Sequence, residues 1–261
     1  MRTIQAAIIA LLLLAGLYGC AAGRPDGRQQ PVELTVSAAA SLQDALEEVK
    51  TVFEREHPNI RIHYNFGSSG ALQKQIAQGA PVDLFFSAAV QPFAELKQEG
   101  LMDSAHEKTV LANELVLIVP KQEEGAIQSL DDITRAKRVA IGIPESVPAG
   151  IYAKQTLEQA GLWEKVKPRL VLAKDVRQVL TYVETGNVDA GFVYRTDALV
   201  SGNVKIAAVV PDEMHEPIVY PLGVVKTTKH LQEARQFYAY LTSEQALKQF
   251  ERHGFRRARQ H

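Results

Sequence analysis

Four short stretches stand where a predicted strand passes into a predicted helix. Three of them, residues 38–41, 67–70 and 147–150, contain only alanine, serine, glycine, valine and proline, and the fourth covers residues 174–176. Small side chains let backbone N–H groups approach a ligand closely. The first N–H groups of a helix are unpaired and carry about half a positive charge. Several helix starts that converge on one point would therefore bind an anion without any cationic side chain.

Each junction also has a purely structural interpretation. Ser41 suits the N-cap of a helix, with Asp44 three residues later as a variant of the capping box. Residues 67–70 could form only a turn, and Pro148 suits the first position of a helix. Each junction alone favours this structural interpretation, whereas four such junctions in one chain together favour an anion site.

Three side chains near the junctions are further candidates for contact with an anion. Tyr194 ends a predicted strand, where a tyrosine usually belongs to the core, so alone it indicates little. Lys174 and Arg177 flank the fourth junction, but on a helix both side chains can equally point to solvent. The residues themselves thus favour a neutral anion site over one built on cations.

Motifs of catalysis and metal binding are missing from the sequence. It contains no G-x-S-x-G elbow, no Walker A pattern, no G-x-G-x-x-G and no H-E-x-x-H. Its 7 histidines are scattered without the spacing of metal ligands. We therefore expect no enzyme, no catalytic residue, no cofactor and no bound metal cation.

The periodicity of apolar residues predicts strands that alternate with helices from residue 32 onward. Predicted strands cover residues 32–36, 60–66, 82–87, 115–119, 139–143, 170–173, 190–194 and 218–225. Predicted helices cover residues 42–53, 71–78, 92–99, 150–159, 175–184, 231–240 and 243–252. This alternation is typical of an α/β fold with largely parallel sheets and helices on their faces. Ligands of such folds bind beyond the carboxyl ends of the strands, where the four junctions lie.

Composition and charge place the chain among ordinary globular proteins. Of its 261 residues, 46% are hydrophobic and 23% are charged. The 29 lysines and arginines nearly balance the 30 aspartates and glutamates. Because nucleic-acid binding needs a basic excess, we expect no nucleic-acid partner.

The N-terminus has the features of an export signal. Arg2 precedes an apolar run over residues 6–18 that is too short to span a bilayer comfortably, and the single cysteine, Cys20, follows directly. Residues 17–20 resemble a lipobox, so we expect a lipoprotein signal peptide over residues 1–19, a lipidated Cys20 and a flexible tether over residues 20–31. Ordinary secretion, with Cys20 incidental, is the alternative.

With these junctions in view, the chain resembles the molybdate-binding proteins of bacterial molybdate ABC importers. The similarity extends from the first strand to residues 253–255. It rests on these motifs: Ala-Ala-Ala-Ser-Leu at 38–42, Gly-Ala-Pro-Val-Asp-Leu-Phe at 79–85, Val-Pro-Ala-Gly-Ile-Tyr-Ala-Lys at 147–154, Asp-Val-Arg at 175–177 and Val-Tyr at 193–194.

The resemblance implies a two-lobed periplasmic-binding-protein fold of type II. Each lobe would be a mostly parallel sheet flanked by helices, with the ligand in the cleft between the lobes. Residues 32–113 and 220–261 would form lobe 1, and residues 114–219 would form lobe 2. Crossover strands near residues 115–119 and 218–225 would form the hinge.

The resemblance also implies the residues that bind the oxyanion. Ser41 and Ser69 would each offer a hydroxyl and a backbone N–H, Ala149 and Val176 only a backbone N–H, and Tyr194 its phenol. The molybdenum would be held as an oxyanion, so no residue is expected to coordinate a cation. One departure is the pair of glycines at 67 and 70, where relatives often carry more small polar residues.

The implied function is capture of molybdate, and of tungstate as well, by an extracytoplasmic protein anchored to the bacterial membrane through Cys20. Its partners would be the permease and ATPase subunits of an ABC importer, with docking on the permease, and it would act as a monomer. The alternative is another tetrahedral oxyanion such as sulfate, which also only accepts hydrogen bonds. Phosphate carries protons and would need an acceptor carboxylate, which the implied ligand set does not contain.

Overall fold

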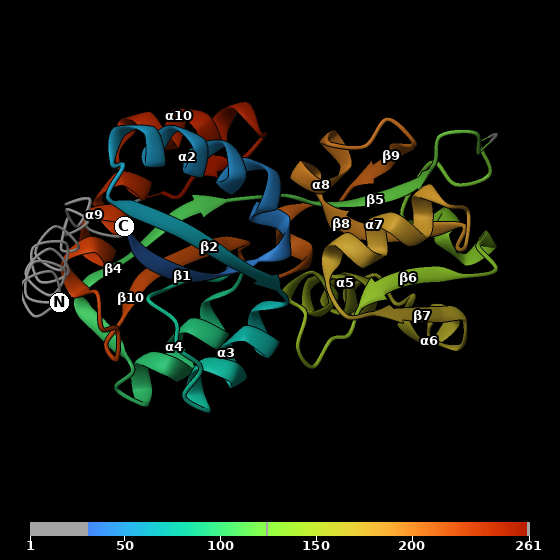
Figure 1. The fold of residues 1–261 in the computed structure, drawn as a ribbon. Coiled ribbons are helices and arrows are strands. Elements are labelled where there is room, and N and C mark those ends of the chain that lie inside the picture. Colours follow the sequence, from blue (N-terminus) through green and yellow to red (C-terminus); the bar gives the residue numbers. More distant parts are fainter. Residues whose placement is uncertain (1–30, 124, 260–261) are drawn as a thin grey trace, which may run out of the picture. The chain divides into compact units, whose positions relative to one another are not determined.

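A computed structural model describes residues 31–123 and 125–259, which form two β-sheets with helices packed on them (Figure 1). The predicted signal peptide, Cys20 and the predicted tether up to residue 30 lie outside the described residues. Among the described residues, no helix is both long enough and apolar enough to cross a membrane.

The first sheet has six strands in the order β11-β4-β10-β3-β1-β2. Strand β1 is parallel to β2 and β3, whereas β10 is antiparallel to β3 and β4, and β11 is antiparallel to β4. The strands are β1 (Val32–Ala39), β2 (Ile60–Gly67), β3 (Leu84–Phe86), β4 (Met102–Ala112), β10 (Val219–Val225) and β11 (Arg256–Arg257).

The second sheet has five strands in the order β7-β6-β8-β5-β9. Strand β6 is parallel to β7 and β8, and β5 is antiparallel to β8 and β9. The strands are β5 (Leu115–Pro120), β6 (Val139–Gly142), β7 (Leu170–Ala173), β8 (Ala190–Tyr194) and β9 (Val204–Val209).

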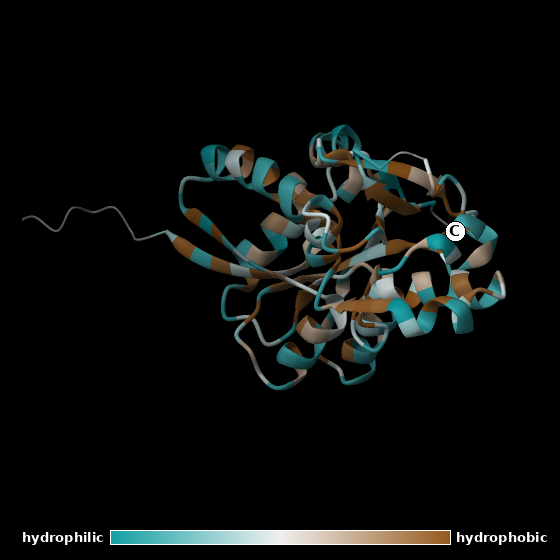
Figure 2. Ribbon diagram, turned by 90° about the vertical axis from the view of Figure 1, so that its right-hand side faces the viewer, coloured by the Kyte–Doolittle hydropathy of each residue, from teal (hydrophilic) through white to brown (hydrophobic). Residues whose placement is uncertain are grey.

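Helices cover both sheets. On the first sheet they are α2 (Gln43–Glu56), α3 (Ser69–Ala77), α4 (Val90–Gln98), α9 (Leu231–Leu241) and α10 (Glu244–Arg252). On the second sheet they are α5 (Pro148–Gln159), α6 (Trp163–Val166), α7 (Val176–Glu184) and α8 (Arg195–Leu199). Short 3₁₀ turns are η1 (Ala40–Leu42), η2 (Asp131–Arg135), η3 (Lys167–Arg169) and η4 (Asp212–Met214). Figure 2 shows that hydrophobic residues gather on the strands and on the inner faces of the helices.

The helices form because their apolar residues recur at helical spacing and their ends carry stop signals. Helix α2 buries Ala45, Leu46, Val49 and Phe53 and ends two residues before Pro58. Helix α7 begins at an Asp175 N-cap, whose carboxylate accepts a hydrogen bond from the N–H of Gln178 at 2.9 Å. This cap fixes the point at which α7 starts.

Asp83, part of the motif at residues 79–85, has a structural role. Its carboxylate accepts hydrogen bonds from the N–H of Thr35 in β1, at 2.7 Å, and from the hydroxyl of Thr228. Because Asp83 is 7% exposed, these bonds are shielded from water. The bond from Thr35 joins the start of β3 to β1, and the bond from Thr228 joins it to the segment after β10.

The chain passes between the two sheets at two places. Asn113 and Glu114 connect β4 with β5, and residues 210–218 connect β9 with β10. The N–H of Asn113 donates to the carbonyl of Ile218 at 3.1 Å, which joins the two crossings. The predicted lobe boundaries and hinge motion remain predictions.

The predicted α/β class is confirmed, but the sheets are mixed rather than mostly parallel. The sequence prediction also missed β4, β9 and the two-residue β11. Strand β4 contains Asp103, His106, Glu107 and Lys108. Apart from its short pairing with β11, one edge of β4 has no strand partner among the described residues. Polar and charged side chains are common on such edges. Strand β9 is the edge of the second sheet and is only partly buried, so it lacks a strong apolar signal.

Candidate functional site

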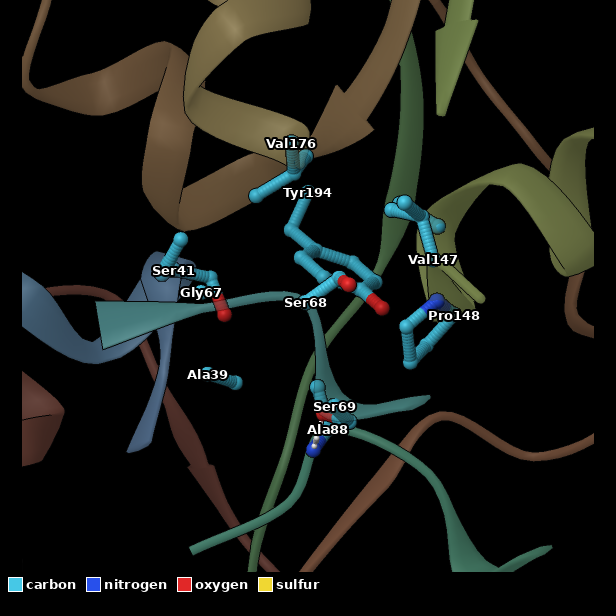
Figure 3. A pocket seen from close by; sticks show the side chains of 12 residues that line it. Ala39, Ser41, Gly67, Ser68, Ser69, Ala88, Val147, Pro148, Val176 and Tyr194 are labelled. Carbon is cyan, nitrogen blue, oxygen red and sulfur yellow. Dashed lines mark hydrogen bonds between the residues drawn. The ribbon is translucent and has the colours of Figure 1, made fainter. Parts of the chain in front are cut away.

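A small pocket lies where the four predicted junctions meet (Figure 3). Strand ends and helix starts of both sheets contribute to it. The described residues that line the pocket are all uncharged. They are Ala39, Ala40, Ser41, Gly67, Ser68, Ser69, Ala88, Val147, Pro148, Ala149, Val176 and Tyr194. An anion in this pocket would therefore depend on hydroxyls, backbone N–H groups and helix dipoles.

The structure brings all five predicted ligand residues to this pocket. Ser41 lies in η1, and Ser69 is the first residue of α3, so these two come from the first sheet. Ala149 and Val176 are the second residue of α5 and the first residue of α7, and Tyr194 is the last residue of β8. These three come from the second sheet, so candidate donors face the pocket from both sides.

Three backbone N–H groups at the helix starts are free to bind a ligand. Ser69, Ala149 and Val176 occupy first or second helical positions, where an N–H has no acceptor within the helix. Among the described residues, these N–H groups donate no hydrogen bond to another acceptor. Each also lies at the positive end of its helix dipole, which favours an anion.

The start of α5 can approach the pocket because glycine stands at two positions. A Cβ on Gly150 would lie 2.0 Å from the carbonyl oxygen of Gly142, and a Cβ on Gly142 would lie 2.3 Å from a methyl carbon of Val147. Both distances are far below any van der Waals contact. The glycines thus let α5 pack directly on the end of β6, and this packing positions the N–H of Ala149. Pro148 stands at the first helical position, as predicted.

The hydroxyl of Tyr194 is buried and directed into the pocket. Its ring extends from the end of β8 into the pocket (Figure 3), the residue is 1% exposed, and its oxygen has no hydrogen-bond partner among the described residues. Burial raises the pKa of Tyr194 well above its ordinary value, so the phenol keeps its proton. An unpaired buried hydroxyl is unfavourable, and a bound acceptor would relieve this cost.

Each of the two serine hydroxyls has one polar partner. The Ser69 Oγ accepts a hydrogen bond from the N–H of Ala88 at 2.9 Å, so its own proton is free. The Ser41 Oγ lies 3.0 Å from the Tyr220 hydroxyl oxygen. The expected N-cap role of Ser41 is wrong, because η1 precedes α2 and the N-cap of α2 is Leu42.

The guanidinium of Arg177 forms ion pairs with two carboxylates. It lies 2.5 Å from the Asp44 carboxylate of α2 and 2.7 Å from the Asp197 carboxylate of α8. Neither Arg177 nor Lys174, the other cation near this junction, lines the pocket. The idea that either side chain contacts a bound anion therefore has no support in this geometry.

Asp197 is fully buried next to the pocket, which gives a pH prediction. Burial raises the pKa of its carboxyl from 3.8 to about 6, although Arg177 and the N–H of Tyr194 oppose the shift. The folded protein thus binds this proton more tightly than the unfolded chain does, and the resulting stabilisation is lost as the pH rises from about 4 to about 7. We expect the free energy of unfolding of the wild type, relative to Asp197→Asn, to fall by about 1–3 kcal/mol over that range.

Chemical denaturation of both ligand-free proteins at the two ends of the range checks this expectation. The difference between the two proteins removes the contribution of the other titrating groups. A difference that does not change with pH would contradict the raised pKa of Asp197.

A close backbone contact joins the two sides of the pocket. The N–H of Gly70 in α3 donates to the carbonyl of Ser146, which precedes α5, at 3.0 Å. A Cβ on Gly70 would lie 2.7 Å from that oxygen and 2.9 Å from the Ser146 Cα. Glycine at position 70 is therefore required for this approach, whereas nothing among the described residues requires glycine at position 67.

Sequence reasoning missed some residues at the site. Ala88 lines the pocket and could have been found, because Ser87-Ala88-Ala89 is another small-residue stretch between a strand and a helix. Tyr220 and Asn113 stand behind Ser41, and nothing in the local sequence signals them.

Comparisons with known proteins agree with this architecture. The profile of the family described as bacterial extracellular solute-binding protein matches residues 34–256. The chain is 51% identical over 251 residues to YvgL of Bacillus subtilis, which carries the provisional name of ABC transporter substrate-binding lipoprotein, with 96% of this chain and 95% of that one covered. It is 38% identical to the molybdate-binding protein ModA of Haemophilus influenzae, with 94% and 95% covered.

A solved structure supports the same relationship. The periplasmic molybdate-binding protein of Azotobacter vinelandii superposes with a TM-score of 0.77 at 26% identity, covering 85% of this chain and 98% of that one. The similarity therefore includes the fold as well as the sequence.

Proposed function

Because the chain belongs to the bacterial extracellular solute-binding proteins of ABC transporters, in the ModA family, we propose that it binds molybdate in the pocket between its two sheets. This family captures solutes and does not catalyse reactions. One observation carries the proposal: an uncharged pocket into which a buried, unpartnered Tyr194 hydroxyl and the free N–H groups of three helix starts are directed.

The ligands would be Ser41, Ser69, Ala149, Val176 and Tyr194. All of them can donate hydrogen bonds, which suits an anion that only accepts them. Molybdate and tungstate are such anions at neutral pH, and we propose that both bind. Hydrogen phosphate must also donate a proton, and no carboxylate lines this pocket among the described residues. Sulfate is smaller than molybdate, so its oxygens could not reach all the donors of a fixed set, and some hydrogen bonds would not form.

Calorimetric titration of the wild-type protein with molybdate, tungstate, sulfate and phosphate tests this proposal. We expect tight binding of molybdate and tungstate, weaker binding of sulfate and the weakest binding of phosphate. Sulfate binding as tight as that of molybdate would contradict the assignment.

We further propose that the two sheets belong to lobes that close on the ligand. Residues 32–113 and 220–261 would form one lobe and residues 114–219 the other, with the hinge at the two crossings between the sheets. The proposal is supported by donors that come from both sides of the pocket and by the contact of Gly70 with Ser146.

Gly70→Ala is expected to impair this closure. The added Cβ would meet the backbone of Ser146, so the two sides of the pocket must move apart by several tenths of an ångström. We expect molybdate affinity to fall roughly 10-fold or more, because donors on one side lose their geometry. Small-angle scattering should show a smaller radius for the wild type with saturating molybdate and a smaller change for the variant.

Gly202→Ala is the control, because a Cβ on Gly202 would meet no atom within 4 Å and Gly202 does not line the pocket. It should retain molybdate affinity. Equal affinity of Gly70→Ala and the wild type would contradict the closure proposal.

Within the importer, the protein would deliver its ligand by docking on the permease, which works with an ATPase subunit. We propose that it does so as a monomer tethered to the outer side of the cell membrane by a lipid on Cys20. The apolar run before Cys20 and the lipoprotein name of the Bacillus subtilis relative support the anchor.

Cys20→Ser should release the protein from the membrane, because it removes the atom to which the lipid is attached. Fractionation of cells that express the full chain would detect the variant in the soluble periplasm or the medium. Full retention of the variant in the membrane fraction would overturn the anchor.

A further inference from the structure

A line of buried polar side chains stands behind Ser41, outside the set of proposed ligands. The hydroxyl oxygens of Ser41 and Tyr220 are 3.0 Å apart, and the Tyr220 oxygen lies 3.1 Å from Asn113 Nδ2. The three residues are 2%, 0% and 7% exposed, respectively. Because bulk water hardly reaches them, these groups must satisfy each other.

The orientation of the Asn113 amide sets the direction of the hydrogen bonds. The N–H of Glu114 donates to Asn113 Oδ1 at 2.9 Å, which identifies this atom as the oxygen. The opposite atom is therefore the NH₂ group, which can only donate. It donates to Tyr220 and, at 2.9 Å, to the hydroxyl of Thr196.

The Tyr220 proton then has a single acceptor. Its oxygen already accepts from Asn113, and burial raises the pKa of Tyr220, so the hydroxyl keeps its proton. Among the described residues, the remaining hydrogen-bond partner of this hydroxyl is the Ser41 Oγ. If Ser41 donated instead, the Tyr220 proton would be buried without an acceptor, which is unfavourable.

We infer that Asn113 and Tyr220 are positioning residues that fix the Ser41 hydroxyl as a hydrogen-bond donor towards the pocket and thereby select oxyanions that carry no proton. The inference rests on the proposed function. Ser41 accepts from Tyr220, so the proton of Ser41 points to the ligand. Ser69 is set in the same way by the N–H of Ala88. Either serine could accept a hydrogen bond from hydrogen phosphate only by turning its own proton away from the anion, and the contacts above leave that proton no other acceptor among the described residues.

A double-mutant cycle on Tyr220 and Ser41 tests this inference, with molybdate as the probe. Tyr220→Phe keeps the ring and removes the donor to Ser41, so molybdate affinity should fall roughly 5- to 50-fold. In the Ser41→Ala background the same change should alter affinity by less than about 2-fold, because Tyr220 acts through Ser41. Asn113→Ala should show the same dependence on Ser41 with a smaller loss.

Tyr64→Phe is the matched control. It removes a tyrosine hydroxyl that donates to the carbonyl of Leu46 at 2.9 Å and does not line the pocket. Its molybdate affinity should equal that of the wild type. An equal loss from Tyr220→Phe in both Ser41 backgrounds, or no loss in the wild-type background, would overturn the inference.

Titration with inorganic phosphate gives a second measurement, the ratio of molybdate to phosphate affinity. A purely structural role of Tyr220 would not change this ratio. Tyr220→Phe frees the Ser41 hydroxyl to rotate and to accept a hydrogen bond from the P–OH group of hydrogen phosphate, so the ratio of molybdate to phosphate affinity should fall at least about 5-fold. Equal weakening of both anions would overturn the selectivity. Failure of the wild type to bind molybdate would instead refute the proposed function, so the two failures can be told apart.

Discussion

Ala149→Asp is expected to abolish molybdate binding. Ala149 is 1% exposed at the start of α5, and no residue that lines the pocket, among those described, carries a positive charge. The new carboxylate would face a doubly charged anion in a site shielded from water, where like charges repel strongly. We expect the affinity to fall by a factor on the order of 1,000 or more in a calorimetric titration.

Ala149→Asn separates the effect of charge from that of size. Asparagine has the volume of aspartate but no charge, so it should weaken binding much less. If both variants bound molybdate equally well, the neutral pocket would not be the binding site. Thermal unfolding of the ligand-free variants shows whether the fold is kept.

Tyr194→Phe should weaken molybdate binding roughly 5- to 150-fold, which corresponds to one lost donor of about 1–3 kcal/mol. The volume of the side chain hardly changes, and the hydroxyl has no partner among the described residues that its removal would leave unpaired. In the ligand-free protein the variant should therefore be as stable as the wild type or more so. Calorimetric titration and thermal unfolding measure the two effects.

Lys174→Ala provides the contrast, because this cation lies near the fourth junction but does not line the pocket. It should retain molybdate affinity. If Tyr194→Phe had no effect while Lys174→Ala or Arg177→Ala abolished binding, the anion would be held by cations, and the neutral pocket would be refuted.

The candidate site could be predicted because its signals are local. A strand that ends in small residues before a helix can be recognised within a few positions, and Ser41, Ser69 and Ala149 stand at such junctions. Val176 stands at a fourth junction, whose residues are larger, and the resemblance to the molybdate-binding proteins implied the individual ligands. Gly150 is an example of such a local signal. Only glycine at this position lets α5 approach β6, so the residue type itself indicates the close packing. Tyr194 indicates a binding site only when it is considered together with the other four proposed ligand residues.

The parts that were missed depend on contacts between distant residues. Ser41 and Tyr220 are 179 positions apart, and Asn113 and Tyr220 are 107 apart, so no local pattern joins them. The same holds for Arg177, whose carboxylate partners come from α2 and α8. Strand β4 was missed because most of one of its edges has no strand partner among the described residues and allows polar side chains, which removes the apolar alternation of a buried strand.

X-ray diffraction at the molybdenum absorption edge would test the central claim most directly. Crystals of the protein grown with molybdate should give one strong anomalous peak in the pocket, with its oxygens in hydrogen-bond contact with Ser41, Ser69 and Tyr194 and with the N–H groups of Ala149 and Val176. A pocket without an anomalous peak at saturating molybdate, or a peak held by lysine and arginine side chains elsewhere, would contradict the account.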